Sequence, residues 1–149
     1  MPKNDDVAAW AALLRAQAAV LPRLEHALTK VGLPLTWYDV LLVVNAAPER
    51  RLTMSELGRQ AVVSRERVSR VVTDLVEVGL VERVPNPDDR RSAYAAITAE
   101  GRRRLRAAAP VYLAAVDEHF LRHLRAPEIS TVTRALGRVV QEEEARARH

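Results

Sequence analysis

Apolar residues recur at helical spacing along the first thirty residues of the chain. The steps of three, four and seven between them are typical of one apolar stripe on a helix. The stripe consists of Val7, Trp10, Leu13, Leu14, Leu21, Leu24, Leu28 and Val31. This spacing predicts an amphipathic helix over 7–31 that ends near Gly32 and is kinked or locally broken at Pro22.

Helix-start and helix-stop signals divide the next segment into three helices. Thr36 is a candidate N-cap for a helix that stops before Pro48. The sequence TMSE at 53–56 matches the T-x-x-E capping box and predicts a short helix. Ser64 then caps a third helix, for which Gly79 is the C-terminal stop. Only about three residues separate the last two helices, which is the spacing of a helix-turn-helix.

A hairpin and two long helices follow. The segments LVERV (80–84) and SAYAAIT (92–98) have the composition of short strands, and the residues between them are rich in Pro, Asn and Asp. Thr98 is a candidate N-cap for a helix that reaches about Leu124. Pro127 suits the first turn of a last helix.

Together these elements predict a mainly α fold with a small β-hairpin wing. Residues 36–98 form a winged helix-turn-helix within a single domain of residues 1–149. The helices at 7–31 and 99–146 flank it, and each has an apolar stripe that one small winged domain could not fully cover. A second copy of the chain would cover these stripes, so the flanking helices are predicted to form a homodimer.

Composition narrows the class of protein. Of the 149 residues, 48% are hydrophobic and 28% are charged, which suits one globular domain. No apolar run approaches the ~20 residues of a membrane span, and Asp5 and Asp6 stand where a signal peptide is positively charged, so we expect a cytoplasmic protein. The absence of cysteine excludes disulfides and thiol redox sensing. No motif indicates an enzyme or a cofactor site.

Positive charge is concentrated in the middle of the chain. The net charge is +4, but residues 50–106 alone contain 13 basic residues, all of them arginine, against 8 acidic residues. Arginine suits planar, bidentate contact with phosphate or guanine better than lysine does. This distribution predicts a polyanion-binding part between nearly neutral flanks.

The helix after Ser64 has one apolar and one polar face. On a helical wheel the apolar face consists of Val68, Val71, Val72 and Leu75, and the polar face of Glu66, Ser69, Arg70 and Thr73. Such a polar face suits the major groove of DNA, with Arg65 near the helix start, Arg67 on the flank and Arg70 in reach of guanine or phosphate. Glu66 precedes Arg70 by four residues, so we expect an ion pair, although Glu66 could instead accept from cytosine. A solvated surface helix has the same pattern.

Two arginines stand at the tip of the hairpin, in the segment NPDDRRS. Arg90 or Arg91 could enter the minor groove beside a groove-bound helix, because the negative potential there attracts a guanidinium. Asp88 or Asp89 would orient that guanidinium by a charge-assisted hydrogen bond. The alternative is a solvated turn with local ion pairs, but a basic helix and a basic tip together favour DNA.

The motifs SEL, VSR, GLVER, DRR and ITAEG occur in this order between residues 52 and 105. They resemble the DNA-binding core of the MarR family of bacterial transcriptional regulators, and the flanking helices extend the resemblance over nearly the whole chain. The resemblance implies a homodimer that represses transcription from a palindromic operator. The candidate DNA contacts are Ser64, Arg65, Arg67, Ser69, Arg70, Thr73, Asp89, Arg90 and Arg91. The segment AYAAIT lacks the basic residue that many members have in the second wing strand.

The resemblance also implies a small aromatic or phenolic effector that binds between the dimer helices and the winged part and releases the DNA. The candidate ligand-binding residues are Trp10, Trp37, Tyr38 and Asp39. Asp39 is also the third residue after Thr36, so an ordinary helix cap is the simpler explanation for it.

Two further interpretations remain open from the sequence. His119 and His123 are four residues apart on a predicted helix, which suits either metal binding or proton sensing, but no third ligand is evident and no metal site is predicted. The rival to a DNA-binding regulator is a winged helix used for protein–protein contact, which would have an apolar or acidic recognition face.

Overall fold

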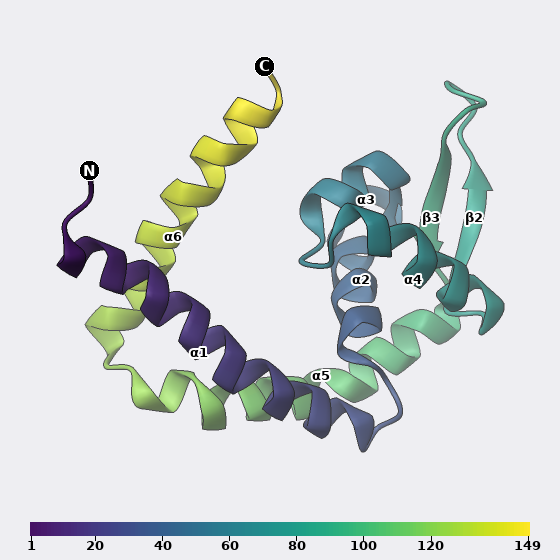
Figure 1. Ribbon diagram of the computed structural model, residues 1–149. Coiled ribbons are helices and arrows are strands. Elements are labelled where there is room, and N and C mark those ends of the chain that lie inside the picture. The colour runs from purple at the N-terminus through teal and green to yellow at the C-terminus, as the bar shows by residue number, and fades with distance from the viewer.

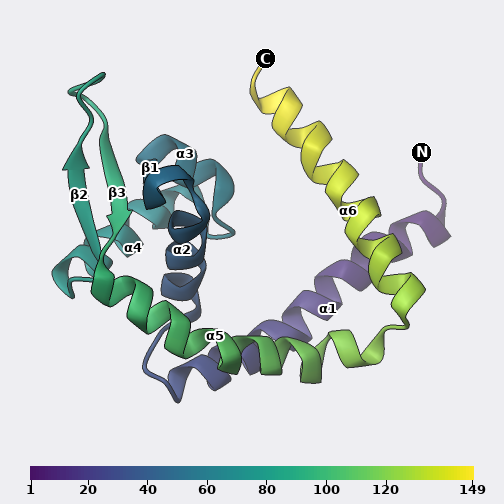
Figure 2. The ribbon, with the colours of Figure 1, turned by 180° about the vertical axis from the view of Figure 1, so that it is seen from behind.

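The computed structural model describes all 149 residues and confirms a mainly helical chain with a small sheet. The helices are α1 (Asn4–Thr29), α2 (Leu35–Ala46), α3 (Met54–Gln60), α4 (Arg65–Glu77), α5 (Ala99–His119) and α6 (Ala126–Ala147). The strands are β1 (Arg51–Thr53), β2 (Val81–Pro85) and β3 (Ala93–Ile97), and two short 3-10 turns span Pro48–Arg50 and Leu121–His123. Figures 1 and 2 show a winged part, formed by α2, α3, α4 and the sheet, and an arm formed by α1, the C-terminal half of α5 and α6.

Strand β1 is the element that the sequence did not predict. The sheet has the order β1-β3-β2 and both pairs are antiparallel, with Arg51 and Glu82 opposite Ala96 on the two sides of β3. β1 has only three residues, too few for an alternating pattern to be recognised. Its hydrogen-bond partner β3 lies beyond α4 and β2 in the sequence, so no local sequence signal marks it as a strand.

Two helix starts in the winged part are capped as predicted. The Thr53 hydroxyl accepts the N–H of Glu56 at 3.2 Å, and the Glu56 carboxylate accepts the N–H of Thr53 at 2.9 Å, which confirms the capping box. The Thr98 hydroxyl accepts the N–H of Gly101 at 3.0 Å and donates to the carbonyl of Gly79 at 2.7 Å. Thr98 therefore caps α5 and also ties its start to the turn that ends α4.

Two predicted helix boundaries are wrong. Thr36 is not the cap of α2, because this helix begins at Leu35, directly after Pro34. The pyrrolidine ring fixes φ of Pro34 at −55°, a value compatible with a helix start, and no side chain caps the helix. The helix predicted to reach about Leu124 ends at His119, and a separate 3-10 turn follows it.

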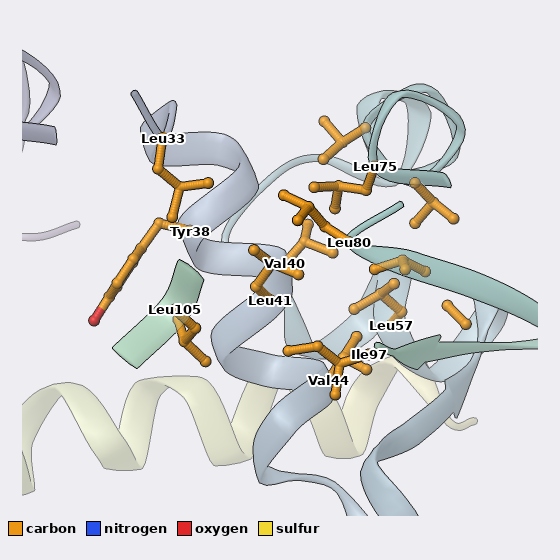
Figure 3. Packing of buried hydrophobic residues seen from close by; sticks show 14 of the residues in the cluster. Leu33, Tyr38, Val40, Leu41, Val44, Leu57, Leu75, Leu80, Ile97 and Leu105 are labelled. Carbon is orange, nitrogen blue, oxygen red and sulfur yellow. The ribbon is translucent and has the colours of Figure 1, made fainter. Parts of the chain in front are cut away.

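The hydrophobic core of the winged part is arranged around α2. Val40, Leu41 and Val44 of α2 are completely buried. Figure 3 shows them within one cluster, together with leucines of α3 and α4 and residues of the sheet such as Ile97. Helix α4 and the wing sheet, which carry the candidate DNA contacts, therefore both pack against α2.

The arm has much less cover than the winged part. α1 continues through Pro22 and buries only Leu24 and Leu28, whereas Trp10 in its first half is 61% exposed. α6 buries no residue at all, and both ribbon views show it standing apart from the winged part. None of the helices has the length and apolarity required to cross a membrane.

We expect Gly101→Ala to destabilise the chain by roughly 1–3 kcal/mol, the cost of forcing an extra methyl group into a packed site. A Cβ at this position would lie 2.1 Å from the carbonyl oxygen of Leu80 and 2.8 Å from Cγ1 of Ile97. The control is Gly137→Ala in α6, where an added Cβ meets nothing within 4 Å and should stabilise the helix by about 0.5–1 kcal/mol. Urea unfolding at fixed chain concentration measures both changes, and equal effects would contradict the close contact.

Candidate nucleic-acid interface

Helix α4 presents a polar, cationic face to solvent. The four residues of the predicted apolar face, Val68, Val71, Val72 and Leu75, are buried. The predicted polar face and the helix start are exposed, and they comprise Ser64, Arg65, Glu66, Arg67, Ser69, Arg70 and Thr73. Ser64 occupies the N-cap position as predicted, but its side chain makes no capping hydrogen bond, so its hydroxyl is available to an external group.

The predicted ion pair between Glu66 and Arg70 is not formed. None of the ion pairs of the chain includes either residue. Both side chains are exposed. Such a pair on a helix surface contributes only about 0.3–0.5 kcal/mol, which the ordering of two long side chains offsets. Arg70 is therefore unpaired in the free protein, and all of its donors are available.

The turn before α4 is fixed by Asp39, a role that the sequence did not suggest. Its Oδ2 atom accepts the N–H of Val62 at 2.9 Å and the N–H of Val63 at 3.3 Å. Asp39 therefore does not cap its own helix. Its carboxylate instead connects α2 to the α3–α4 turn. Burial raises the pKa of the Asp39 carboxyl above its usual range, and the two backbone hydrogen bonds oppose that rise.

Thr73 lies on the exposed polar face of α4, but its hydroxyl already makes two hydrogen bonds. It donates to the carbonyl of Ser69 at 3.0 Å and accepts a hydrogen bond from Nη2 of Arg83 in β2 at 3.1 Å. Sequence reasoning missed Arg83. The signal was its place in β2, because residue 83 pairs with the buried Ala95 and so lies on the face of the sheet that packs toward α4. Arg83 connects the wing directly to α4.

The tip of the wing is shaped by side chain to backbone hydrogen bonds. Asn86, the one buried polar residue, donates to the Ser92 hydroxyl at 3.1 Å and accepts the N–H of Asp88 at 3.0 Å. Asp89 accepts the backbone N–H of Arg91 at 2.9 Å. In the free protein neither Asp88 nor Asp89 pairs with a guanidinium, and Asp89 orders the backbone of the turn. That one of them orients a guanidinium on DNA stays a prediction.

Arg90 and Arg91 are exposed at this tip, and neither belongs to an ion pair. The structure brings the polar face of α4 and these two arginines to the winged part, where the hairpin projects beside α4 (Figure 1). This arrangement gives two separate cationic contacts, one helical and one on an extended tip, which fit the major groove and the adjacent minor groove of a duplex.

The candidate ligand residues are only partly brought together. The ring of Tyr38 is buried and stacks on Tyr112 of α5, with centroids 4.4 Å apart, and burial raises the pKa of both phenols. The charge of Asp39 raises the pKa of Tyr112 further, so these three polar groups form one cluster. Trp37 packs against the same core. Trp10 is exposed in the first half of α1, which extends away from α2.

The two histidines do not share one helix as predicted. His119 is the last residue of α5, and His123 lies in the 3-10 turn that follows, so their expected i, i+4 geometry is lost. His119 Nε2 lies 4.0 Å from Glu118 Oε2. No group of three or more His, Cys, Asp or Glu side chains in the chain is arranged to bind a metal ion.

Comparison with known proteins gives consistent results. The sequence profile of the MarR family matches residues 31–92. The chain is 32% identical over 124 residues to the HTH-type transcriptional repressor Rv2887 of Mycobacterium tuberculosis, covering 83% of this chain and 87% of that protein. Among solved structures, the MarR family regulator Sco3205 of Streptomyces coelicolor, in complex with DNA, superposes with a TM-score of 0.84 at 28% identity over 96% of this chain and 89% of that one. CouR of Rhodococcus jostii, bound to p-coumaroyl-CoA, superposes with a TM-score of 0.76 at 26% identity over 87% and 89%.

We expect Arg83→Ala and Thr73→Val each to weaken binding of duplex DNA several-fold, because either change frees the wing from α4 at a cost of about one hydrogen bond. The double variant should bind DNA as tightly as the weaker-binding of the two single variants, since each single change already removes the same hydrogen bond. Thr73→Ser keeps the hydroxyl and serves as the control. Fluorescence anisotropy titrations measure the four affinities, and additive losses would show that Arg83 and Thr73 act separately.

A second prediction concerns Asp39. Because its folded pKa is raised, the neutral carboxyl favours the fold, and this contribution is lost as the pH rises through the folded pKa. Asp39→Asn keeps an acceptor and stays neutral, so its stability relative to the original chain should be higher near pH 7 than near pH 4. Asp39→Ala leaves two amides without their acceptor and should cost about 1 kcal/mol or more at both pH values. Urea unfolding at the two pH values tests this, and a pH-independent difference for the Asn variant would contradict it.

Proposed function

The chain belongs to the MarR family of DNA-binding transcriptional regulators, which are not enzymes, and on this premise we propose that it is a repressor that binds a palindromic operator as a homodimer and is released by a small aromatic effector. The observation that carries the proposal is that the winged part has two exposed groups of arginines, one on α4 and one at the wing tip, which form no ion pairs within the chain. The exposed arginines of α4 would read the major groove, while Arg91 enters the minor groove next to it.

The homodimer is supported by the apolar surface of the arm. Leu13 and Leu14 of α1 and Leu136, Val139 and Val140 of α6 are exposed, although they lie on helices at opposite ends of the chain. A second copy would bury these side chains. The two α4 helices of such a dimer would enter successive major grooves about one DNA turn apart, and the two-fold symmetry of the protein would be matched by a palindromic operator.

The aromatic effector is supported by the cluster between α2 and α5. Tyr38 and Tyr112 present stacked rings next to the carboxylate of Asp39, and CouR, which has the same fold, is a relative whose structure contains p-coumaroyl-CoA. Asp39 also fixes the turn before α4. A ligand that inserts at these rings and displaces Asp39 would therefore loosen the start of the recognition helix, and DNA affinity would fall.

The test is binding of the protein to the intergenic DNA upstream of its own gene, measured by gel shift with excess unrelated duplex. We expect binding that survives the competitor, with two chains for each operator. Arg91→Ala should weaken it about tenfold or more, because one minor-groove arginine contributes on the order of 1–3 kcal/mol. Arg148→Ala removes the same charge from an exposed position at the C-terminal end and should have little effect.

Loss of binding with rising salt should be steep, since counterions are released from the phosphates that the arginines neutralise. Binding that the competitor abolishes would place the operator elsewhere in the genome. No binding at low salt would overturn the proposal in favour of a winged helix that contacts protein.

A further inference from the structure

The outward face of the wing sheet contains a cavity of about 560 Å³ that lies apart from the DNA contacts and from the tyrosine cluster. We call it the basin and define it by Asn45, Arg50, Arg51, Glu82, Ala96 and Arg102. Its floor follows from the strand register. Arg51 and Glu82 lie opposite Ala96 on either side, and opposite residues share a face of the sheet. The short side chain of Ala96 between two long ones leaves the hollow, which the end of α2 and the first turns of α5 enclose.

Of the three arginines around the basin, only one forms an ion pair. Arg51 is held in place, because its guanidinium is 2.8 Å from Glu49 and lies 4.3 Å above the ring of Tyr94. Arg50 and Arg102 belong to no ion pair of the chain. The lining contains three arginines and two glutamates, an excess of one positive charge, so a monoanion would neutralise it.

The backbone at the rim is strained. Glu49 and Arg50 have φ values of 58° and 53°, in the left-handed region that ordinary residues avoid. Two such residues in succession cost on the order of 1–3 kcal/mol each, a cost that glycine would not incur. This backbone conformation places the side chains of Glu49 and Arg50 at the basin. Strained residues of this kind cluster at functional sites.

Asn45 provides a further unused group. Its Oδ1 atom is the one buried side-chain acceptor in the chain without a hydrogen-bond partner. A buried polar atom of this kind costs about 1–3 kcal/mol when it stays unpaired. Rotation of the amide about χ2 is soft, so the oxygen can turn toward the basin that Asn45 lines.

We propose that the basin binds a small hydroxycarboxylic acid. The carboxylate is bound by the guanidinium groups of Arg50 and Arg102, the hydroxyl donates to Oδ1 of Asn45, and the carbon skeleton lies on Ala96. This site is independent of DNA binding and of the tyrosine cluster. It contacts all three strands and α5, so an occupant fixes the base of the wing against the helix that leads into the arm.

The test is a titration of the full-length protein with sodium lactate, followed by ¹H–¹⁵N NMR at constant ionic strength in a buffer free of other carboxylates. We expect saturable shifts of the backbone amides of Arg51, Glu82 and Ala96, with a Kd on the order of millimolar, as befits a ligand of so few atoms. Propionate, which lacks the hydroxyl, should bind several-fold more weakly. Asn45→Ala should remove that preference and leave propionate binding unchanged.

The combined variant Arg50→Ala and Arg102→Ala should weaken lactate binding at least about tenfold, because it removes two charge-assisted contacts. Arg148→Ala, which removes one positive charge from an exposed position outside the basin, is the control and should bind as the original chain does. Three results would each overturn the proposal: no shifts at the basin, equal binding by the combined variant, or binding of sulfate as tight as that of lactate. Because the experiment contains no DNA, its failure leaves the proposed repressor function untouched.

Discussion

Three hydrogen bonds at Thr98 join the recognition helix, the wing and the arm at one point. The hydroxyl donates to Gly79 and accepts from Gly101, and the N–H of Thr98 donates to the carbonyl of Leu80 at 3.1 Å. Gly101 allows α5 to sit against the backbone of Leu80, where a larger residue would force the two apart. The direction of α5 relative to α4 is therefore fixed by backbone contact, and the spacing of two recognition helices in a dimer would be inherited from it.

α2 has the corresponding role inside the winged part. Its buried valines and leucines form the centre of the core, Asp39 reaches the turn before α4, and Tyr38 stacks on Tyr112 of α5. A displacement of α5 thus reaches α4 by two routes, through Thr98 at one end of the wing and through α2 at the other. The cationic surfaces at α4 and the wing tip contribute little to this framework, which leaves them free for binding.

Features encoded by short sequence patterns were predictable, and those that depend on distant partners were not. The capping box at Thr53, the buried stripe of α4 and the exposed tip arginines all follow from neighbours within a few residues. Strand β1, the bond of Arg83 to Thr73 and the contact of Asp39 with Val62 join segments that meet only in the folded chain. The Glu66–Arg70 pair failed for another reason, because correct spacing on a solvated helix is too weak to order two side chains.

The wing tip illustrates how a residue can act on binding without touching the bound molecule. Asn86 and Asp89 order the turn through their own hydrogen bonds, so the backbone beneath Arg90 and Arg91 is already constrained in the free protein. A tip of this kind loses little conformational entropy on association, and only the arginine side chains remain to be immobilised. Evolution could therefore tune the residence time on DNA through the acidic and amide positions of the loop, while the arginines that we propose to enter the groove stay unchanged.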